Sequence, residues 1–323
     1  MQQNNNSPRV HFKKYQVLDG STRTLVERVG DGSIITRFDK TPFPRGNNDV
    51  VCPHFLELKW ATGCPYSCAW CYLQGTLRFQ AYKAKPHPKD FSKIGQHLTA
   101  LFEGDGIRPE LLNAGELSDS MISEHRKTPF SKFIMGLTSN QQQHKILFVT
   151  KSHHIDNLLS IDNPHQAVVS FSLNAGQVAA KWEKAPPITK RIEAASRLKH
   201  AGFETRIRID PMVPIDNWEK AYGDLIDSLM SRFEPDRITL GSLRGLQSTI
   251  NNARDKTWTK YLNEQSNWGK KIPTEIRKEM YTTTIRQLKR NYNYKSIALC
   301  KETVAMWNTL GMNYKKIQCN CLP

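Results

Sequence analysis

Short apolar runs alternate with longer amphipathic stretches between residues 55 and 245, and this alternation predicts the fold. The apolar runs are typical of strands, and the stretches between them have helical periodicity, most clearly at residues 88–102 and 189–200. Gly202 follows the second predicted helix at a position where helices commonly end. Strands that alternate with helices form a parallel sheet with right-handed crossovers. The six predicted strands are residues 55–60, 110–114, 145–149, 167–171, 204–209 and 237–240.

This pattern predicts an α/β fold, a partial TIM-like (β/α)6 barrel, over residues 55–245. Residues 1–54 are polar and weakly periodic, so we expect an ordered but irregular N-terminal extension. Beyond residue 245 the alternation stops, and we expect a separate C-terminal region, residues 246–323, with helices at 273–292 and 301–310.

Positive charge is concentrated in that C-terminal region. The 323-residue chain has a formal net charge of +16, and residues 246–323 hold 14 Lys and Arg against 5 Asp and Glu. Such a field favours a polyanionic partner, nucleic acid first, although a solvated basic surface is the simpler alternative. Aromatic residues lie among these cations, as suits base stacking, but each ring could instead pack the region onto the barrel. The rings are Trp258, Tyr261, Trp268, Tyr281, Tyr292, Tyr294, Trp307 and Tyr314.

The compartment expected from the sequence is the cytoplasm. The first residues lack the apolar core of a secretory signal, and no apolar run reaches the roughly 18 residues that a membrane span requires, so we expect no membrane partner. Seven cysteines, an odd number in a long chain, argue against a disulfide framework. Three of them fall within eight residues and point to a metal or a cluster.

Cys64, Cys68 and Cys71 have the spacing C-x3-C-x2-C directly after the first predicted strand. Three thiolates on one tight loop can bind three corners of an iron–sulfur cube. With no fourth cysteine nearby, one iron is left free for an exogenous ligand. A structural zinc site would need four closed ligands, which the neighbourhood does not offer.

This spacing resembles the signature of the radical S-adenosylmethionine (SAM) enzymes. The resemblance implies a [4Fe–4S] cluster whose open iron holds SAM, reductive cleavage of SAM to a 5′-deoxyadenosyl radical, and hydrogen abstraction from a substrate. It also implies an electron donor such as a flavodoxin or a ferredoxin. The position agrees with barrel enzymes, whose loops at the carboxyl ends of parallel strands carry the chemistry.

The residues around the cysteines narrow the resemblance. The stretch from Lys59 to Thr76, with its continuation Cys71-Tyr72-Leu73-Gln74, is similar to spore photoproduct lyase and its DNA-repair relatives. Further matches follow the second, third and fourth predicted strands. In that family the corresponding Ser, Lys and Ser side chains contact SAM, which implies this role for Ser118, Lys151 and Ser172. Arg208, near the end of the fifth predicted strand, is a candidate for the SAM carboxylate or for a phosphate.

One residue departs from the family pattern. Spore photoproduct lyase needs a cysteine just after the second strand to return a hydrogen atom to the product radical, and here Glu116 occupies that position. A carboxylate cannot donate a hydrogen atom, so Glu116 could bind a substrate amine or hydroxyl, act as a base, or form a salt bridge or a contact that orients SAM. The family tyrosine is kept as Tyr72, whereas the residue before the last cluster cysteine, often tyrosine, is Trp70.

The chain ends in a second cysteine motif, Cys319-Asn320-Cys321. This tail could fold back over the barrel and supply the missing thiol, or it could be a loose end with spare thiols. Cys52 and Cys300 are typical of buried core thiols. Candidate catalytic residues are therefore Tyr72, Glu116, Cys319 and Cys321.

The sequence thus favours a radical SAM enzyme of the spore photoproduct lyase type that acts on nucleic acid, as a carbon–carbon lyase or a nucleotide-modifying enzyme. Because Glu116 replaces the cysteine, a radical SAM enzyme acting on a small molecule, a peptide or a protein is the alternative. A nucleic-acid-binding module with a structural or sensory cluster is the third hypothesis.

Overall fold

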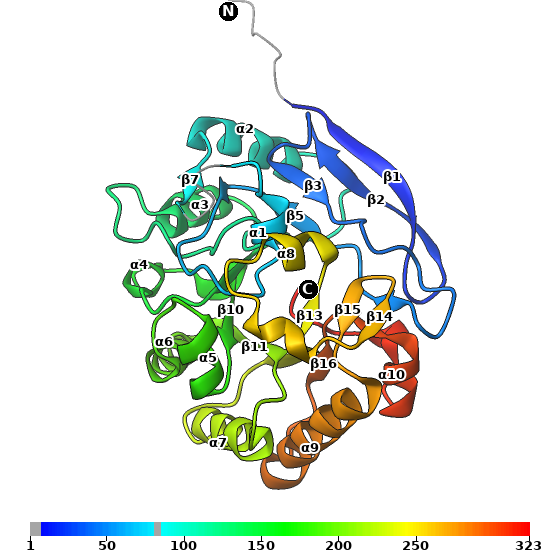
Figure 1. Cartoon of the computed structure of the whole chain (residues 1–323). Helices are drawn as coiled ribbons and strands as arrows, with labels where there is room; N and C mark the ends of the chain where they lie inside the picture. Colours follow the sequence, from blue (N-terminus) through cyan, green and yellow to red (C-terminus); the bar gives the residue numbers. More distant parts are fainter. Residues whose placement is uncertain (1–7, 81–84) are drawn as a thin grey trace, which may run out of the picture.

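Seven parallel strands form the curved centre of the computed structural model, which describes residues 8–80 and 85–323 (Figure 1). The arc stays open, since no strand pairing joins its two edges within the described residues. Six of the strands confirm the six predicted from the sequence, and the partial-barrel prediction is confirmed with them. In order across the arc they are β5 (Leu56–Leu58), β8 (Leu111–Asn113), β9 (Lys145–Thr150), β10 (Ala167–Leu173), β11 (Glu204–Met212), β12 (Arg237–Ser242) and β16 (Ile297–Leu299).

The seventh strand, β16, comes from the C-terminal region that we expected to lie outside the barrel. It pairs in parallel with β12, with Ile238 opposite Ile297 and Leu240 opposite Leu299. Three apolar residues between polar stretches are too short a signal to separate a strand from a buried turn. The barrel therefore has one more parallel strand than the sequence predicted.

The prediction of an irregular N-terminal extension is wrong. Strands β1 (Val10–Gln16), β2 (Thr22–Val29) and β3 (Ile35–Arg37) run antiparallel, and β3 pairs with β5, so the sheet continues to ten strands. Gly20, with φ of +90°, sits in the turn between β1 and β2, where a side chain would be strained. Most side chains of β1 are exposed or half-buried, so its apolar alternation is too weak to recognise.

Helices surround the arc on its convex side (Figure 1). The expected helices at residues 88–102, 189–200 and 273–292 are present as α2, α6 and α9, whereas the one at 301–310 is shortened because its first residues form a strand. The longer helices are α2 (Phe91–Phe102), α3 (Phe130–Thr138), α6 (Ile188–His200), α7 (Trp218–Met230) and α9 (Thr274–Tyr292). The shorter ones are α1 (Leu73–Thr76), α4 (Asp156–Leu159), α5 (Gly176–Trp182), α8 (Gln247–Asn252) and α10 (Val304–Thr309), with 3-10 turns at Pro164–Gln166, Thr257–Tyr261 and Tyr314–Lys316.

Small sheets complete the fold. The strand β17 (Glu302–Thr303) pairs antiparallel with β4 (Val50–Val51), which ties the C-terminal region to the N-terminal one. The others are β6 (Ala61–Thr62) with β7 (His87–Pro88), and β13 (Arg244–Gly245) with β15 (Gly269–Lys271) and β14 (Glu264–Ser266).

The aromatic residues of the C-terminal region mostly fill the core. Trp258 and Tyr281 are fully buried, and Trp307 and Tyr294 nearly so. These four rings cannot stack on bases. The alternative, that they pack the C-terminal region onto the barrel, is confirmed for them. Tyr261, Trp268, Tyr292 and Tyr314 are half-buried and pack against the same core.

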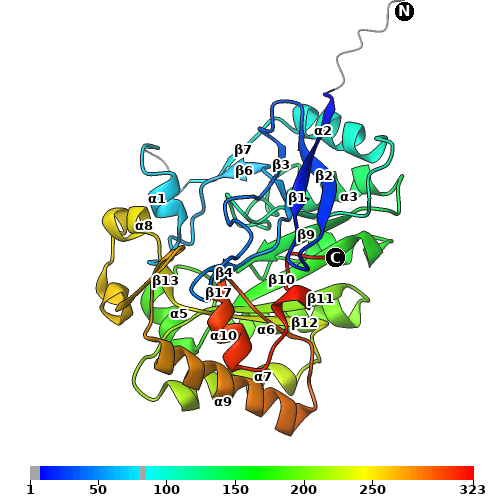
Figure 2. The same cartoon turned by 90° about the vertical axis from the view of Figure 1, so that its right-hand side faces the viewer.

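The concave face of the arc is polar, and the end of the chain covers it. Alternation along β10, β11 and β12 puts Ser170, Arg206 and Thr239 on this face, whereas Val169 and Phe171 face the helices. Figures 1 and 2 place the C-terminus inside the arc. The Asn320 side chain is completely buried there and bonds to Ser170 Oγ at 2.8 Å, the Ile207 carbonyl at 2.9 Å and Thr239 Oγ1 at 2.7 Å.

Within the described residues, no helix combines the length and the apolar character that crossing a bilayer demands.

Asn320→Ala should lower the free energy of unfolding by about 2 kcal/mol or more, because it leaves a buried donor and acceptors on three strands without partners. Asn308→Ala, at an exposed position on α10, is the matched control and should change it by less than about 0.5 kcal/mol. Urea denaturation of both variants measures the difference. Equal midpoints would show that the tail adds nothing to the stability of the barrel.

Candidate active site

The three-cysteine loop follows β6 at the edge where the parallel strands end. Gly63 and Ser67 both have positive φ, +87° and +44°, which folds the loop tightly back on itself. The Cys71 amide donates to the Cys68 carbonyl at 3.0 Å, and the Ala69 amide donates to the Trp182 carbonyl at 2.9 Å. The loop therefore has a defined shape and is anchored to the end of α5.

The residues that continue the motif hold the loop. The Gln74 amide nitrogen donates to the carbonyls of Cys68 and Ala69, both at 2.8 Å, and its oxygen accepts the Arg254 amide at 3.0 Å. A side chain on Gly75 would lie 2.7 Å from the backbone of Thr249, so only glycine lets α1 pack on α8 here. Gln74 and Gly75 thus join the cysteine loop to the C-terminal region.

Burial raises the pKa of all three thiols, that of Cys64 to about 12, and nearby thiols and carboxylates add to the effect at Cys64 and Cys68. Three buried thiolates repel one another unless positive charge neutralises them, so this donor set fits an iron–sulfur cube. No three Cys, His, Asp or Glu side chains converge on one ion within residues 8–80 and 85–323. A cube does not require that, because each thiolate binds a different iron, whereas a zinc ion does.

Ser118 and Asp119 fasten the loop after β8 to its neighbours. The Ser118 hydroxyl is buried and donates to the Gly63 carbonyl at 2.6 Å, just before the first cysteine. The Asp119 carboxylate accepts bonds from Thr150 Oγ1 and from the Lys151 amide, both at 2.7 Å. Ser118 therefore borders the cysteine loop, and its hydroxyl contacts the backbone just before Cys64.

Lys151 belongs to a buried ion network. Its ammonium lies 3.0 Å from Glu183, and Arg191 contacts the other oxygen of that carboxylate at 2.8 Å. Arg191 also donates to the Ser172 carbonyl at 3.0 Å. Burial alone would raise the pKa of Glu183, but the two cations, chiefly Lys151, lower it. Burial alone would lower the pKa of Lys151, but Glu183 and Cys68 raise it. Lys151 is thus a charged group that Glu183 holds in place beside the cysteine loop.

Ser172 and Arg208 lie opposite each other on β10 and β11. One guanidinium nitrogen of Arg208 lies 3.0 Å from Cys321 Sγ, and its Nε is a buried donor with no hydrogen-bond partner among the described residues. An unpartnered buried guanidinium nitrogen is suited to an anionic group of a ligand.

Asp210 does not pair with Arg208. It forms a two-fold ion pair with Arg244, at 2.8 and 3.0 Å, and the missing side chain of Gly241 leaves room for its carboxylate. Cys300 lies against this pair, 3.5 Å from Arg244 Nη2.

Glu116, Tyr72 and the tail meet at Asn113. The Asn113 amide donates to Glu116 Oε1 at 2.9 Å and approaches Cys321 Sγ at 3.8 Å. The Tyr72 hydroxyl donates to the Glu116 carbonyl and lies 3.3 Å from its carboxylate. Burial, reinforced by the charge of Glu116, raises the pKa of Tyr72, so its phenol stays protonated.

The candidate residues around the cysteine loop lie near the carboxyl ends of the parallel strands, and Cys321 reaches Arg208 and Asn113 from inside the arc. Sequence reasoning missed several of their partners. Asn113, Glu183, Arg191 and Asn320 carry no motif of their own, and each matters through a residue far away in the chain. For Asn113, its place at the end of a predicted strand is the only signal that could have drawn attention to it.

The open parallel barrel with a three-cysteine loop at its carboxyl edge defines a radical SAM type of fold. A family model of spore photoproduct lyase matches residues 55–243, and the chain belongs to this family. The family uses a [4Fe–4S] cluster and SAM, and one solved lyase structure contains AdoMet.

Individual relatives agree. The spore photoproduct lyase of Bacillus subtilis is 30% identical over 176 residues, which cover 53% of this chain and 50% of the relative, and that of Clostridium acetobutylicum is 26% identical over 179 residues. The chain thus spans about half the length of the curated relatives it matches. A solved lyase complexed with dinucleoside spore photoproduct has the same fold, with a TM-score of 0.62, 22% identity and coverage of 76% of this chain and 75% of that one.

Glu183→Gln should lower the free energy of unfolding at neutral pH by about 3 kcal/mol, because it leaves Lys151 and Arg191 buried without their counter-charge. Glu193→Gln, at an exposed position on α6, is the control and should stay within about 0.5 kcal/mol of the parent. Chemical denaturation under anaerobic conditions measures both. If the two variants unfold alike, the ion network does not stabilise this end of the barrel.

Proposed function

We propose that this chain is a radical SAM enzyme that abstracts hydrogen from a nucleotide of a nucleic acid, DNA in the first place, as a lyase of the spore photoproduct type or a nucleotide-modifying enzyme. The observation that carries the proposal is the buried three-thiol loop with the Lys151 ammonium beside Cys68. When bound, the cluster and SAM supply a carbon radical that removes hydrogen from the substrate.

Cys64, Cys68 and Cys71 would hold three irons of the cluster and leave the fourth for SAM. The tight backbone of the loop and its bonds to Gln74 and Trp182 support this role, because the thiols are oriented before the cluster binds.

Four residues would bind SAM. The Lys151 ammonium and the free Nε of Arg208 can pair with its carboxylate, and the hydroxyls of Ser118 and Ser172 can bond to its polar groups. Glu183 holds Lys151 in position, so that the ammonium loses little freedom on binding.

Glu116 and Tyr72 would act on the substrate side. Glu116 presents a carboxylate that can accept a bond from a base amide or a hydroxyl, and Asn113 fixes one of its oxygens. Tyr72 keeps its O–H bond, because burial disfavours the phenolate, and it could pass on a hydrogen atom. Glu116 cannot donate a hydrogen atom to carbon, so another residue must do so.

Charge supports the nucleic-acid partner. The segment around Lys256 and Lys260 lies over the cysteine loop, since Trp182 donates to Thr257 Oγ1 at 2.9 Å and Gln74 accepts the Arg254 amide. Both lysines are exposed and can reach phosphates. A flavodoxin or ferredoxin would supply the electron, and the free thiols suit the reducing cytoplasm.

The exchange of the family cysteine for Glu116 supports a second candidate, a radical SAM enzyme of the same build with a small molecule, a peptide or a protein as substrate. The experiments below separate the two.

Anaerobically reconstituted protein should hold about four irons in the cysteine loop, change its cluster spectrum when SAM is added, and form 5′-deoxyadenosine under strong reductant. With deuterium-labelled dinucleoside spore photoproduct, label should pass into 5′-deoxyadenosine. The triple variant Cys64→Ala, Cys68→Ala, Cys71→Ala should lose all three properties, whereas Cys52→Ala should keep them. Zinc at this site, or a cluster indifferent to SAM, would contradict the proposal and favour a structural or sensory cluster.

Affinity for a fluorescent single-stranded oligonucleotide should fall steeply with salt. The double variant Lys256→Glu, Lys260→Glu should reduce the slope of log K against log salt by about 2, because each lysine neutralises one phosphate. Lys132→Glu, exposed on α3 outside the barrel, should leave the slope unchanged. No binding to DNA or RNA even at low salt would favour the small-molecule, peptide or protein substrate.

A further inference from the structure

The last residues of the chain are hydrogen-bonded to the concave side of the barrel. Besides the bonds of Asn320, the Arg206 guanidinium donates to the carbonyls of Asn320 at 2.9 Å and Leu322 at 2.5 Å, and that of Arg237 donates to the carbonyl of Cys319 at 2.7 Å. Two strands therefore supply cations whose bonds set the position of the tail. A loose end with spare thiols, the alternative left open by the sequence, does not describe these residues.

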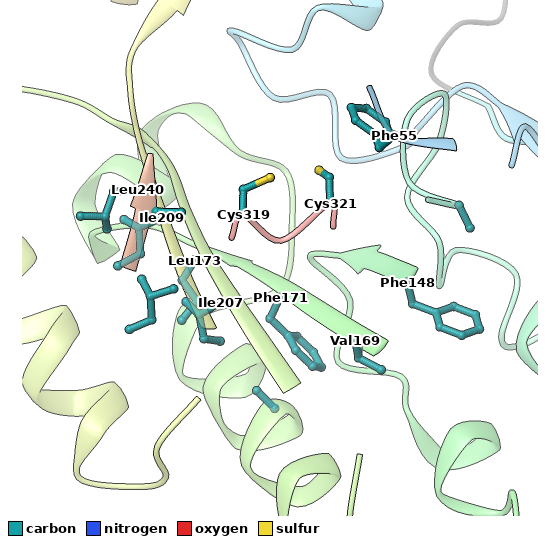
Figure 3. Packing of buried hydrophobic residues seen from close by; sticks show 14 of the residues in the cluster. Phe55, Phe148, Val169, Phe171, Leu173, Ile207, Ile209, Leu240, Cys319 and Cys321 are labelled. Atoms are coloured by element: carbon teal, nitrogen blue, oxygen red, sulfur yellow. The ribbon is translucent and has the colours of Figure 1, made fainter. Parts of the chain in front are cut away.

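Cys319 and Cys321 are buried, with 6% and 8% of their surfaces exposed, and their sulfurs point toward each other on the concave side of the strands (Figure 3). The neighbouring Cys319 thiol, together with Arg208 and against burial and the charge of Glu116, lowers the pKa of Cys321 to about 6, and the pKa of Cys319 is raised. The pair therefore favours a thiolate at Cys321, the sulfur that Arg208 contacts, beside a thiol at Cys319.

The pair lies in the layer of the candidate active site. Cys321 contacts Arg208, which lies opposite Ser172 across the two strands, and Asn113, which bonds to Glu116. Glu116 in turn contacts Tyr72, the residue that directly follows the last cysteine of the loop. An unbroken series of contacts therefore connects the tail sulfurs with the cluster loop.

Resting on the proposed function, we propose that Cys319 and Cys321 act together as a dithiol that donates a hydrogen atom to the carbon radical of the substrate. The S–H bond of Cys319 breaks and a C–H bond forms on the substrate, which leaves an odd electron on sulfur. The neighbouring Cys321 thiolate shares that electron in a two-sulfur radical anion of unchanged charge. One electron from a flavodoxin-type or ferredoxin-type reductant and one proton restore the thiol and the thiolate.

The arrangement explains why two cysteines and a cation occur together. An S–H bond is weak enough to yield a hydrogen atom to carbon, and the carboxylic acid at Glu116 is not. A lone buried thiyl radical would have no adjacent partner, whereas a neighbouring thiolate whose sulfur points toward it can share the unpaired electron. Arg208 compensates the negative charge that the pair carries before and after the transfer.

Turnover of dinucleoside spore photoproduct in D2O tests the transfer, because thiol protons exchange with solvent. The parent protein should place a solvent deuterium in the product, and Cys319→Ser or Cys321→Ser should lose that deuterium and divert the product while 5′-deoxyadenosine still forms. Asn308→Ser, at an exposed position on α10 away from the pair, should behave as the parent. Iron content and thermal unfolding confirm that each variant is folded and loaded.

The outcomes separate the two proposals. Absence of 5′-deoxyadenosine with the parent protein overturns the proposed function and this inference with it. Product formation with unchanged deuterium content in both tail variants overturns the dithiol alone.

A second measurement needs no turnover. Iodoacetamide labelling of the C-terminal peptide in the holoprotein, followed by mass spectrometry across pH, should give Cys321 a midpoint near 6, and Cys319→Ala should move it upward. The groups facing Cys321 are Cys319, Arg208 and Glu116, and Cys52 faces the pair as well. A midpoint at the ordinary thiol value of about 8.5, or one that Cys319→Ala leaves in place, would show that Cys319 does not stabilise a Cys321 thiolate and overturn the dithiol.

Discussion

The concave side of an open barrel must satisfy its polar side chains without a facing strand, and this constraint organises the molecule. Ser170, Arg206 and Thr239 point into the arc, where a lost hydrogen bond costs far more than at the surface. The tail satisfies them, with Asn320 at its centre and its carbonyls held by Arg206 and Arg237. The barrel and the tail therefore form one folding unit, and the two terminal cysteines acquire a fixed position.

Hydrogen bonds from distant parts of the chain also position the cysteine loop. The Gln74 side chain donates to carbonyls of the loop, and its oxygen accepts a hydrogen bond from the Arg254 backbone amide. At Gly75 the helices α1 and α8 lie so close that no larger residue fits. Lys151 stays charged beside the loop because Glu183 is buried with it, and Glu183 stays ionised because Arg191 is its second partner. The charges in this layer come in compensating sets, which lets several of them be buried at once.

Membership of the spore photoproduct lyase family rests on residues 55–243, whereas the tail lies beyond them. The departure inside the matched region, Glu116, and the cysteines outside it meet in space through Asn113. In the mechanism we propose, hydrogen donation has moved from the loop after β8 to the end of the chain, and the loop position has become a polar contact for substrate. In that mechanism Glu116 and the two tail cysteines are parts of one site.

Periodicity and residues close together in the chain were enough to predict the six barrel strands, the helices α2 and α6 between them and the three-cysteine loop. The antiparallel strands at the N-terminus and β16 were not predicted, because exposed strands and three-residue strands show little alternation of apolar and polar residues. Only the tertiary structure decided the partners of Lys151, Arg208 and Asn113. Arg208 and Cys321 are 113 residues apart in sequence, and no local signal encodes such a contact. It follows from the curvature that brings β11 and the end of the chain into the same interior.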